Sequence, residues 1–211
     1  MIRQRASSQD LRCAGAEREV ELAYISLGRY QAEAASSQPI PIATRQQMDW
    51  LTMTETTSTG PTLQAWQKHN ASRLGRWLFA RMVCRRAPYF STIHPRFVEL
   101  RPTLCKVAML RRRGILNHLG GIHALAIGNL CELAAGMVTE VTTPLTTRWI
   151  PRGMTIEYLR KAESDVVATA RLDKSEWAAA GNVAVPVSVA DKNGNEVVRA
   201  VITMHISPMK P

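Results

Sequence analysis

The 211 residues are 45% hydrophobic and 21% charged, a balance typical of a globular protein that excludes the disordered and membrane-like classes. At this length we expect one ordinary domain, with or without an appendage. The formal net charge of +10 raises nucleic acids, membrane surfaces and anionic small molecules as partners. That charge is placed unevenly: residues 53–113 hold twelve Lys or Arg against two acidic residues, whereas the two signs cancel in residues 1–52 and 114–211.

The cysteines are scattered and form no CxxC pair, so we expect reduced thiols with no disulfide framework and no metal site. They are Cys13, Cys84, Cys105 and Cys131. The N-terminus lacks the apolar core of a signal peptide. The charge-free run 114–131 contains two His, two Asn and several Gly, which is too polar for a membrane span. The sequence therefore predicts a cytoplasmic protein with no transmembrane segment.

Residues 1–52 have mixed charge, weak apolar periodicity and a linker-like stretch, SSQPIPIATRQQ. We predict a poorly structured N-terminal extension with at most a short helix around 17–30. Met53 is followed by Thr-Glu-Thr-Thr-Ser, which is typical of a protein start. Our hypothesis is that Met53 is the physiological initiator; a peptide from residues 1–52 in the native protein would contradict it.

Residues 53–94 predict a basic amphipathic helix and its connection to the next domain. Thr59-Gly60-Pro61 is a helix start, apolar residues then recur at helical spacing as far as Met82, and Pro88 ends the pattern. Five arginines accompany the apolar residues, namely Arg73, Arg76, Arg81, Arg85 and Arg86. Three interpretations stay open: a core-packing helix with a solvated basic face, a membrane-surface helix, and part of an anion-binding rim.

Residues 95–208 predict an α+β domain in which two strands precede one long helix and four strands come after it. The strand-like segments are 97–101, 104–112, 155–159, 165–172, 183–190 and 196–207, and Asn193-Gly194 is a hairpin turn signal. The helix is rich in Ala and Gly, which would let strands approach it closely. An antiparallel sheet wrapped around one buried central helix fits this order.

Two motifs resemble a known family. Residues 117–124 read NHLGGIHA and residues 148–154 read RWIPRGM, a pair in this order that is similar to hotdog-fold thioesterases of the phenylacetic-acid type, and closest to an uncharacterised bacterial hotdog family. The resemblance covers about residues 60–208. It implies a hotdog fold, a homodimer or homotetramer, acyl-thioester substrates, and no cofactor apart from the coenzyme A that belongs to the substrate.

Laid on the family pattern without gaps, the sequence places Asn117 at the loop start, His123 and Ala124 at the helix N-terminus and Glu132 further along. The Ala124 N–H, aided by the helix dipole, would stabilise an oxyanion. Glu132 would act as general base or nucleophile, with Asn117 orienting the water and His123 contacting the thioester or fixing the loop. The family's His-Gly-Gly is His123-Ala124-Leu125 here, and three consequences of this departure stay open: a narrower thioester channel, a different substrate size, or a loss of catalysis.

Glu132 lies nine residues beyond His123, which puts it on the opposite face of the helix. Both side chains can serve one substrate only if two subunits pair with their helices side by side, so a dimer is the predicted active unit. Structural interpretations stay open: His123 as a helix-start residue, and Glu132 as a buried acid bonded to Asn129 or to a partner chain.

A coenzyme A carrier is polyanionic and requires cations near the site. The candidates are Arg111, Arg112, Arg113, Arg148, Arg152, Arg160 and Lys161, each of which is otherwise part of a solvated face. Met154, Ile156 and Tyr158 alternate along a strand and either line an acyl pocket or pack in the core.

The leading function is therefore an acyl-CoA or acyl-carrier-protein thioesterase. The alternative is a non-catalytic hotdog protein that binds acyl thioesters or is structural, which the Ala124-Leu125 departure favours. Charge alone supports a nucleic-acid or anionic-membrane binder, and no aromatic RNA-binding signature accompanies it, so we expect no nucleic-acid partner. A hydratase would need a second acid–base residue beside His123, which the sequence does not offer.

Overall fold

A computed structural model describes residues 60–173 and 181–209. The predicted N-terminal extension 1–52, its helix around 17–30 and Met53 lie outside the described residues.

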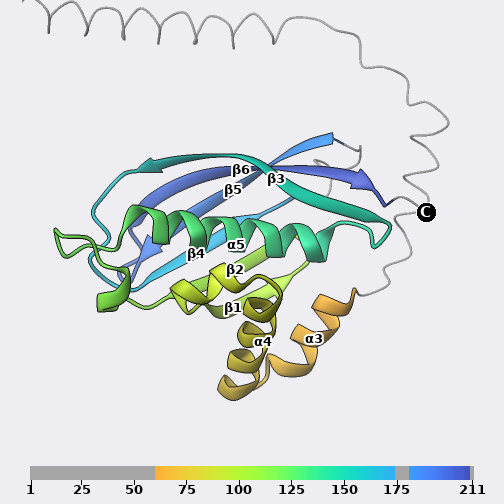
Figure 1. Ribbon diagram of the computed structural model, residues 1–211, viewed down its shortest axis with the longest axis horizontal. Helices are drawn as coiled ribbons and strands as arrows, with labels where there is room; N and C mark the ends of the chain where they lie inside the picture. The colour runs from red at the N-terminus through yellow and green to blue at the C-terminus, as the bar shows by residue number, and fades with distance from the viewer. Residues whose placement is uncertain (1–59, 174–180, 210–211) are drawn as a thin grey trace, which may run out of the picture. The chain divides into compact units, whose positions relative to one another are not determined.

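The described elements have the predicted order of two strands, one long helix and four strands. In chain order they are α3 (Pro61–His69), α4 (Arg73–Arg86), the 3-10 turn η1 (Pro88–Ile93), β1 (Arg96–Arg101), β2 (Leu104–Met109), the 3-10 turn η2 (Arg113–Ile115), α5 (Ala124–Thr142), β3 (Thr147–Tyr158), β4 (Val166–Arg171), β5 (Gly181–Asp191) and β6 (Glu196–Pro208). The strands form one antiparallel sheet in the order β1-β2-β4-β5-β6-β3. Figure 1 shows α5 lying along one face of this sheet, as the sequence predicts.

The core lies between α5 and the sheet. Alternate residues of β5 and β6 point to the helix and are buried, for example Val185, Val187 and Ile202, because the side-chain period of a strand is two. On the helix, Ala134 and Ala135 are fully buried. Their small side chains let the strands approach closely, so α5 is the buried central helix of the domain.

By length and composition α5 would also pass as a membrane span, with a mean hydropathy of 1.3 over its best window. However, 67% of that window is buried inside the protein. One such helix is weak evidence for a span, and burial of this extent is what the core helix of a soluble protein shows. A cytoplasmic location stays a prediction.

Strand β3 is longer than predicted: it begins at Thr147 rather than Thr155. Pro151 has no backbone N–H to donate to a neighbouring strand. It is tolerated because β3 is an edge strand, which has a neighbouring strand on one side only. The pairing with β6 shifts register between Pro151 and Gly153, a bulge that absorbs the irregular residues. A long strand therefore forms one exposed edge of the sheet.

The single helix predicted between Pro61 and Pro88 is two helices, α3 and α4. The chain breaks between α3 and α4, and the Ser72 hydroxyl oxygen accepts a hydrogen bond from the Gly75 N–H at 2.9 Å, which caps α4. A Cβ on Gly75 would lie 2.1 Å from the His69 carbonyl oxygen, so only glycine fits this corner. The rings of Trp66 and Phe97 lie 5.2 and 5.0 Å from that of Phe79, and this cluster fixes both helices against β1.

The Asn193-Gly194 hairpin prediction is confirmed. Gly194 has a φ of 85°, in the left-handed region that favours glycine. The Asp191 carboxylate accepts hydrogen bonds from the N–H groups of Asn193 and Asn195 at 2.8 and 2.9 Å. These bonds fix the register of β5 against β6.

Candidate active site

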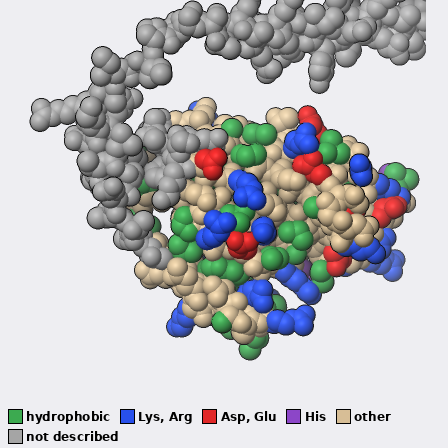
Figure 2. Space-filling model, turned by 180° about the vertical axis from the view of Figure 1, so that it is seen from behind, with side chains coloured by type: hydrophobic (Ala, Val, Ile, Leu, Met, Phe, Trp, Pro, Cys, Tyr) green, Lys and Arg blue, Asp and Glu red, His purple; other side chains and the backbone are tan. Residues whose placement is uncertain are grey.

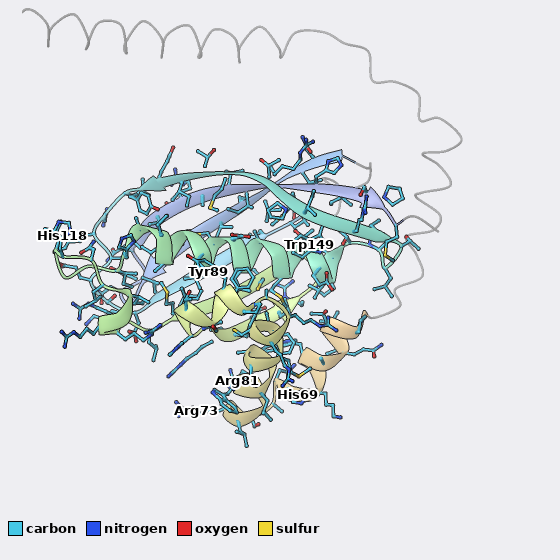
Figure 3. The ribbon with its side chains drawn as sticks, in the orientation of Figure 1. His69, Arg73, Arg81, Tyr89, His118 and Trp149 are labelled. Carbon is cyan, nitrogen blue, oxygen red and sulfur yellow. The ribbon has the colours of Figure 1, made fainter. Side chains whose placement is uncertain are left out.

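The loop before α5 is held by Asn117. Its side-chain oxygen accepts hydrogen bonds from the N–H groups of Leu119 and Gly121 at 3.0 and 3.1 Å. Its backbone N–H donates to the Gly121 carbonyl at 2.8 Å, and Gly120 between them has a φ of 76°. The oxygen end of Asn117 is thus committed to the loop, and its amide NH₂ has no acceptor among the described residues. Figure 3 shows His118 at the tip of this loop.

His123 is the N-cap residue directly before α5. Its Nδ1 accepts a hydrogen bond from the Leu125 N–H at 3.1 Å, so the neutral ring carries its proton on Nε2, which has no partner in the described part of the chain. This hydrogen bond caps the N-terminus of α5, which is the structural role considered for His123 from the sequence. The same turn leaves the Ala124 N–H without an acceptor among residues 60–173 and 181–209. The Ala124 carbonyl accepts the Tyr158 hydroxyl at 3.1 Å.

Glu132 is half-buried on α5 and lies between two glycines of the same helix face. A Cβ on Gly128 would lie 3.3 Å from Ile156, and one on Gly136 would lie 2.9 Å from the Trp149 ring, so β3 covers the helix on either side of Glu132. The side chain of Glu132 has no hydrogen bond or ion pair with any described residue.

The predicted alternative that Asn129 binds Glu132 is wrong, because the Asn129 amide donates to the Thr92 hydroxyl at 3.2 Å. Asn129 therefore joins α5 to η1.

Glu132 opens into a cavity of about 270 Å³ between α5, α3, α4 and η1. Its walls are mostly apolar and include Ala65, Phe79, Val83, Phe90, Leu133 and Met137. The other carboxylate in the cavity is Glu140, which accepts hydrogen bonds from the Thr62 hydroxyl at 3.0 Å and the Trp149 indole at 2.8 Å. Glu140 thus has a structural role, and Glu132 presents a carboxylate with no hydrogen bond or ion pair to a described residue to a largely apolar cavity that Arg86 also lines.

The single chain does not bring His123 and Glu132 together. At 1.5 Å per residue they are separated by about 13 Å along the helix axis, and they lie on different faces. Strand β3, which flanks the Glu132 face of α5, pairs only with β6 in the described chain. A long unpaired edge of this kind is a template for pairing with another chain.

The predicted coenzyme A cations divide into three groups. Arg111 donates to the Gly120 carbonyl at 2.7 Å, and Arg112 donates to the Thr92 carbonyl, so both hold loops in place. Arg148 donates to the Ser207 hydroxyl at 3.2 Å, and Lys161 forms an ion pair with Glu163 at 2.6 Å. The exposed side chains with no hydrogen bond or ion pair to described residues are those of Arg113, Arg152 and Arg160.

The seven cations do not form one cluster in the single chain. Arg148 is next to Trp149, which packs on Gly136 in the C-terminal half of α5. Arg111, Arg112 and Arg113 precede the loop at the other end.

Catalysis by a cysteine thiolate and catalysis by a bound metal ion have no support among the described residues. Cys131 is adjacent to Glu132 in sequence, but burial raises its pKa to about 12, so the thiol stays protonated. Among residues 60–173 and 181–209, no group of three His, Cys, Asp or Glu side chains could hold a metal ion.

Sequence reasoning missed the cavity walls. Phe90 and Arg86 reach the cavity because α4 and η1 fold back over α5, and Trp149 reaches it from β3. The Trp of the RWIPRGM motif is the one signal available in the sequence, and it indicates an aromatic side chain without indicating where that side chain packs. Met154, Ile156 and Tyr158 share the helix-facing side of β3 but do not line this cavity.

Known proteins share both the sequence pattern and the fold of this chain. Residues 75–206 match the model of a family described as a domain of unknown function, DUF4442. The chain belongs to this family. A crystal structure from a structural-genomics programme is 42% identical in sequence, covers 70% of this chain and 98% of its own, and superposes with a TM-score of 0.63.

Two further crystal structures share the fold at lower identity. One is a Pseudomonas aeruginosa protein of unknown function described as a probable thioesterase, with 22% identity, 63% of this chain and 95% of its own covered, and a TM-score of 0.55. The other is a Haemophilus influenzae thioesterase, with 11% identity, coverage of 62% and 89%, and a TM-score of 0.54. These likenesses confirm the predicted α+β hotdog fold. Curated proteins give no significant match.

Proposed function

We propose that this DUF4442 protein hydrolyses acyl thioesters, with coenzyme A or acyl carrier protein as the thiol carrier. The observation that carries the proposal is the Glu132 carboxylate, which is half-buried in a largely apolar cavity and has no partner among the described residues. Desolvating a carboxylate without a partner is unfavourable. A carboxyl group in that position is better explained by a role in the reaction than by a contribution to stability.

The proposed reaction consumes one water and one thioester. Glu132 takes a proton from the water, whose oxygen attacks the thioester carbonyl carbon. The oxyanion that forms accepts a hydrogen bond from the Ala124 N–H at the positive end of the α5 dipole. The C–S bond then breaks, the thiolate takes the proton from Glu132, and a carboxylic acid and a thiol leave. The Asn117 NH₂ and the His123 Nε2 are the remaining polar groups, placed to orient the water and the thioester.

Each site would take Ala124 and His123 from one subunit and Glu132 from the other. The separation of about 13 Å within a chain requires this, and the unpaired edge of β3 supplies the means. Pairing two β3 strands edge to edge would join two sheets and bring the two α5 helices side by side. The homodimer is therefore the proposed minimal active unit, and a tetramer would be a pair of such dimers.

The carrier's phosphates would be bound by exposed cations near the α5 N-terminus. Arg113 and Arg160 are exposed and carry no ion pair within the described chain, which supports them over Arg111 and Arg112, whose guanidinium groups hold loops. Arg152 lies at the bulge in β3, on the proposed dimer edge. Mutation of Arg113 should raise KM for acyl-CoA more than that for a short acyl thioester without phosphates.

A thiol-release assay over acyl-CoA chain lengths tests the proposal. Glu132→Gln should lower kcat by at least about a hundredfold, as expected when a general base is removed. The matched control is Glu196→Gln, an acid at the start of β6 that pairs with Arg199 and Ser188 away from the cavity. Hydrolysis by Glu132→Gln at the wild-type rate would refute the assignment.

Subunit mixing tests the shared site. Asn117→Asp keeps the side-chain oxygen that holds the loop and removes the NH₂, so it is a cleaner partner than an alanine. Mixing inactive Glu132→Gln with inactive Asn117→Asp subunits should restore about a quarter of the wild-type sites if chains exchange at random. Absence of rescue in demonstrated mixed dimers would contradict sharing.

A second function is favoured by one observation. Leu125 is 71% exposed at the α5 N-terminus, beside the Ala124 N–H that would polarise the thioester. The bulk of its side chain at this point supports a protein that binds acyl thioesters without hydrolysing them. Tight acyl-CoA binding with no thiol release from any chain length, and rescue of hydrolysis by Leu125→Gly, would favour this function.

A further inference from the structure

Helix α4 carries a strongly basic surface that the proposed hydrolysis does not use. Residues 60–98 contain seven Lys or Arg and no Asp or Glu. Figure 2 shows blue and green side chains together at the lower end of the described molecule, where Figure 1 places α3 and α4. No arginine of α4 forms an ion pair with a described residue, so this positive charge is uncompensated locally.

The same helix exposes apolar side chains on the face opposite its buried side. Gly75, Phe79 and Ala80 are buried toward the core. At about 100° per residue, Leu74, Trp77 and Leu78 lie on the other side. Their exposed fractions are 66%, 55% and 40%. Large apolar side chains that are exposed together on one helix face are typical of a surface that contacts a partner or a membrane.

Cations are interleaved with these apolar residues. Arg73, Arg81 and Arg85 are exposed and fall on the same half of the helix as Trp77. The Arg81 guanidinium lies 5.5 Å from the centre of the Trp77 ring, a cation–π contact that keeps both side chains at the surface. Figure 3 shows Arg73 and Arg81 on the part of α4 away from the sheet.

An open groove of about 810 Å³ runs along this face. Its walls include Trp77, Met82 and Arg85 of α4, and His94 and Arg96 from the segment that leads into β1. Apolar and cationic groups thus line one surface together. We call the exposed side of α4 with this groove the α4 surface.

We propose that the α4 surface docks on an anionic phospholipid bilayer. Arginines would contact the lipid phosphates while Leu74, Trp77 and Leu78 enter the boundary between headgroups and acyl chains, the arrangement of a helix that lies in the membrane interface. A second copy of this chain is a poorer occupant, because an isologous contact would place the same uncompensated arginines against each other. The inference does not depend on the proposed hydrolysis.

Vesicle co-sedimentation of the full chain tests the proposal. Vesicles of equal parts phosphatidylglycerol and phosphatidylcholine should bind the protein at low salt, and pure phosphatidylcholine vesicles should bind it far less. Binding should weaken as salt rises from about 0.05 to 0.5 M, because the Debye length shrinks. Arg81→Gln and Arg85→Gln should each lower the partition coefficient about fivefold.

Apolar insertion is tested by Trp77→Gln and Leu74→Gln, which should lower partition at every salt concentration. The matched controls are Lys192→Gln, an exposed cation in the β5–β6 turn, and Val201→Gln, an exposed apolar residue on the outer face of β6. Both controls should bind as the wild type does. Circular dichroism of each variant verifies the fold.

Three results would overturn the proposal. The first is no binding to phosphatidylglycerol vesicles at low salt. The second is binding that the α4 variants leave unchanged. The third is a change of oligomeric state in Trp77→Gln without a change in vesicle binding, which would make the α4 surface an interface between copies of the chain. Unchanged acyl-CoA hydrolysis in Trp77→Gln would separate this test from that of the proposed function.

Discussion

Two acidic residues on one face of α5 should respond in opposite ways to the same substitution. Glu132 and Glu140 are eight residues apart on the same helix and line the same cavity. Glu140 accepts hydrogen bonds from Thr62 and Trp149, whereas Glu132 has no partner among the described residues. Methionine matches glutamate closely in helix propensity and length, so Glu→Met isolates the loss of the carboxylate.

For Glu132→Met we expect a gain in the free energy of unfolding of about 1 kcal/mol, since an unpartnered, half-buried carboxylate is replaced by an apolar side chain. For Glu140→Met we expect a loss of about 3 kcal/mol, because the Thr62 hydroxyl and the Trp149 indole N–H both lose their acceptor. The two variants should therefore differ by roughly 4 kcal/mol, which corresponds to a difference in Tm on the order of 10 °C.

Urea unfolding monitored by circular dichroism, at one fixed protomer concentration, measures both values. Glu132→Met should also be inactive in the thiol-release assay. A more stable but inactive variant is what a functional residue predicts. If Glu132→Met loses as much stability as Glu140→Met, then Glu132 is a structural acid and the argument for hydrolysis fails.

Three further results are expected. Gly136→Ala should lower the free energy of unfolding in urea by about 1–2 kcal/mol, because the new Cβ would lie 2.9 Å from the Trp149 ring. This loss should outweigh the better helix propensity of alanine. An unchanged or higher stability would contradict the close packing of Gly136 on Trp149. Cys105 and Cys131 should resist thiol reagents at pH 8 in the native protein and react after unfolding, because burial raises both pKa values, and peptide mapping by mass spectrometry would detect labelling. Hydrogen bonds from the β5–β6 turn lower the pKa of the Asp191 carboxyl below its ordinary 3.8. The stability that Asp191 contributes is therefore complete above pH 3.8 and is lost as the pH falls through the lower pKa of the folded state. Asp191→Ala should flatten the acid side of the curve of stability against pH, and an unaltered curve would refute the assignment.

Much of the fold could be predicted because it rests on local patterns. Alternation of apolar residues marks β5 and β6, and Asn193-Gly194 joins them, so that hairpin needs no information from elsewhere in the chain. The strand β3 was predicted too short because Pro151 and Gly153 are local breakers. Only its position at the sheet edge, which depends on β6, makes them acceptable.

The break between α3 and α4 had a local signal that apolar periodicity hid. Ser72 is an N-cap residue type directly before the first residue of α4, yet apolar residues continue at helical spacing across it. The requirement for glycine at 75 comes from the His69 carbonyl, which approaches only once the chain has turned.

The candidate site was predicted as a set of residue types, and the structure decided which of them have other roles. The motif pointed to Asn117, His123, Ala124 and Glu132, but not to the hydrogen bonds that commit the Asn117 oxygen to the loop or His123 Nδ1 to capping. Likewise, charge runs cannot separate Arg112, which holds Thr92, from Arg113, which is exposed.

By itself the sequence determined the order of the elements, the buried central helix and the concentration of positive charge in residues 53–113, because period, propensity and charge are properties of neighbouring residues. The tertiary structure alone decided that Glu140 accepts two hydrogen bonds and that Glu132 has no partner among the described residues. Thr62 lies 78 residues from Glu140 in the sequence, and folding α3 against α5 brings the two together. Contacts between residues far apart in the chain therefore decide which of the two carboxylates, Glu140, has a structural role and which, Glu132, can contact a substrate.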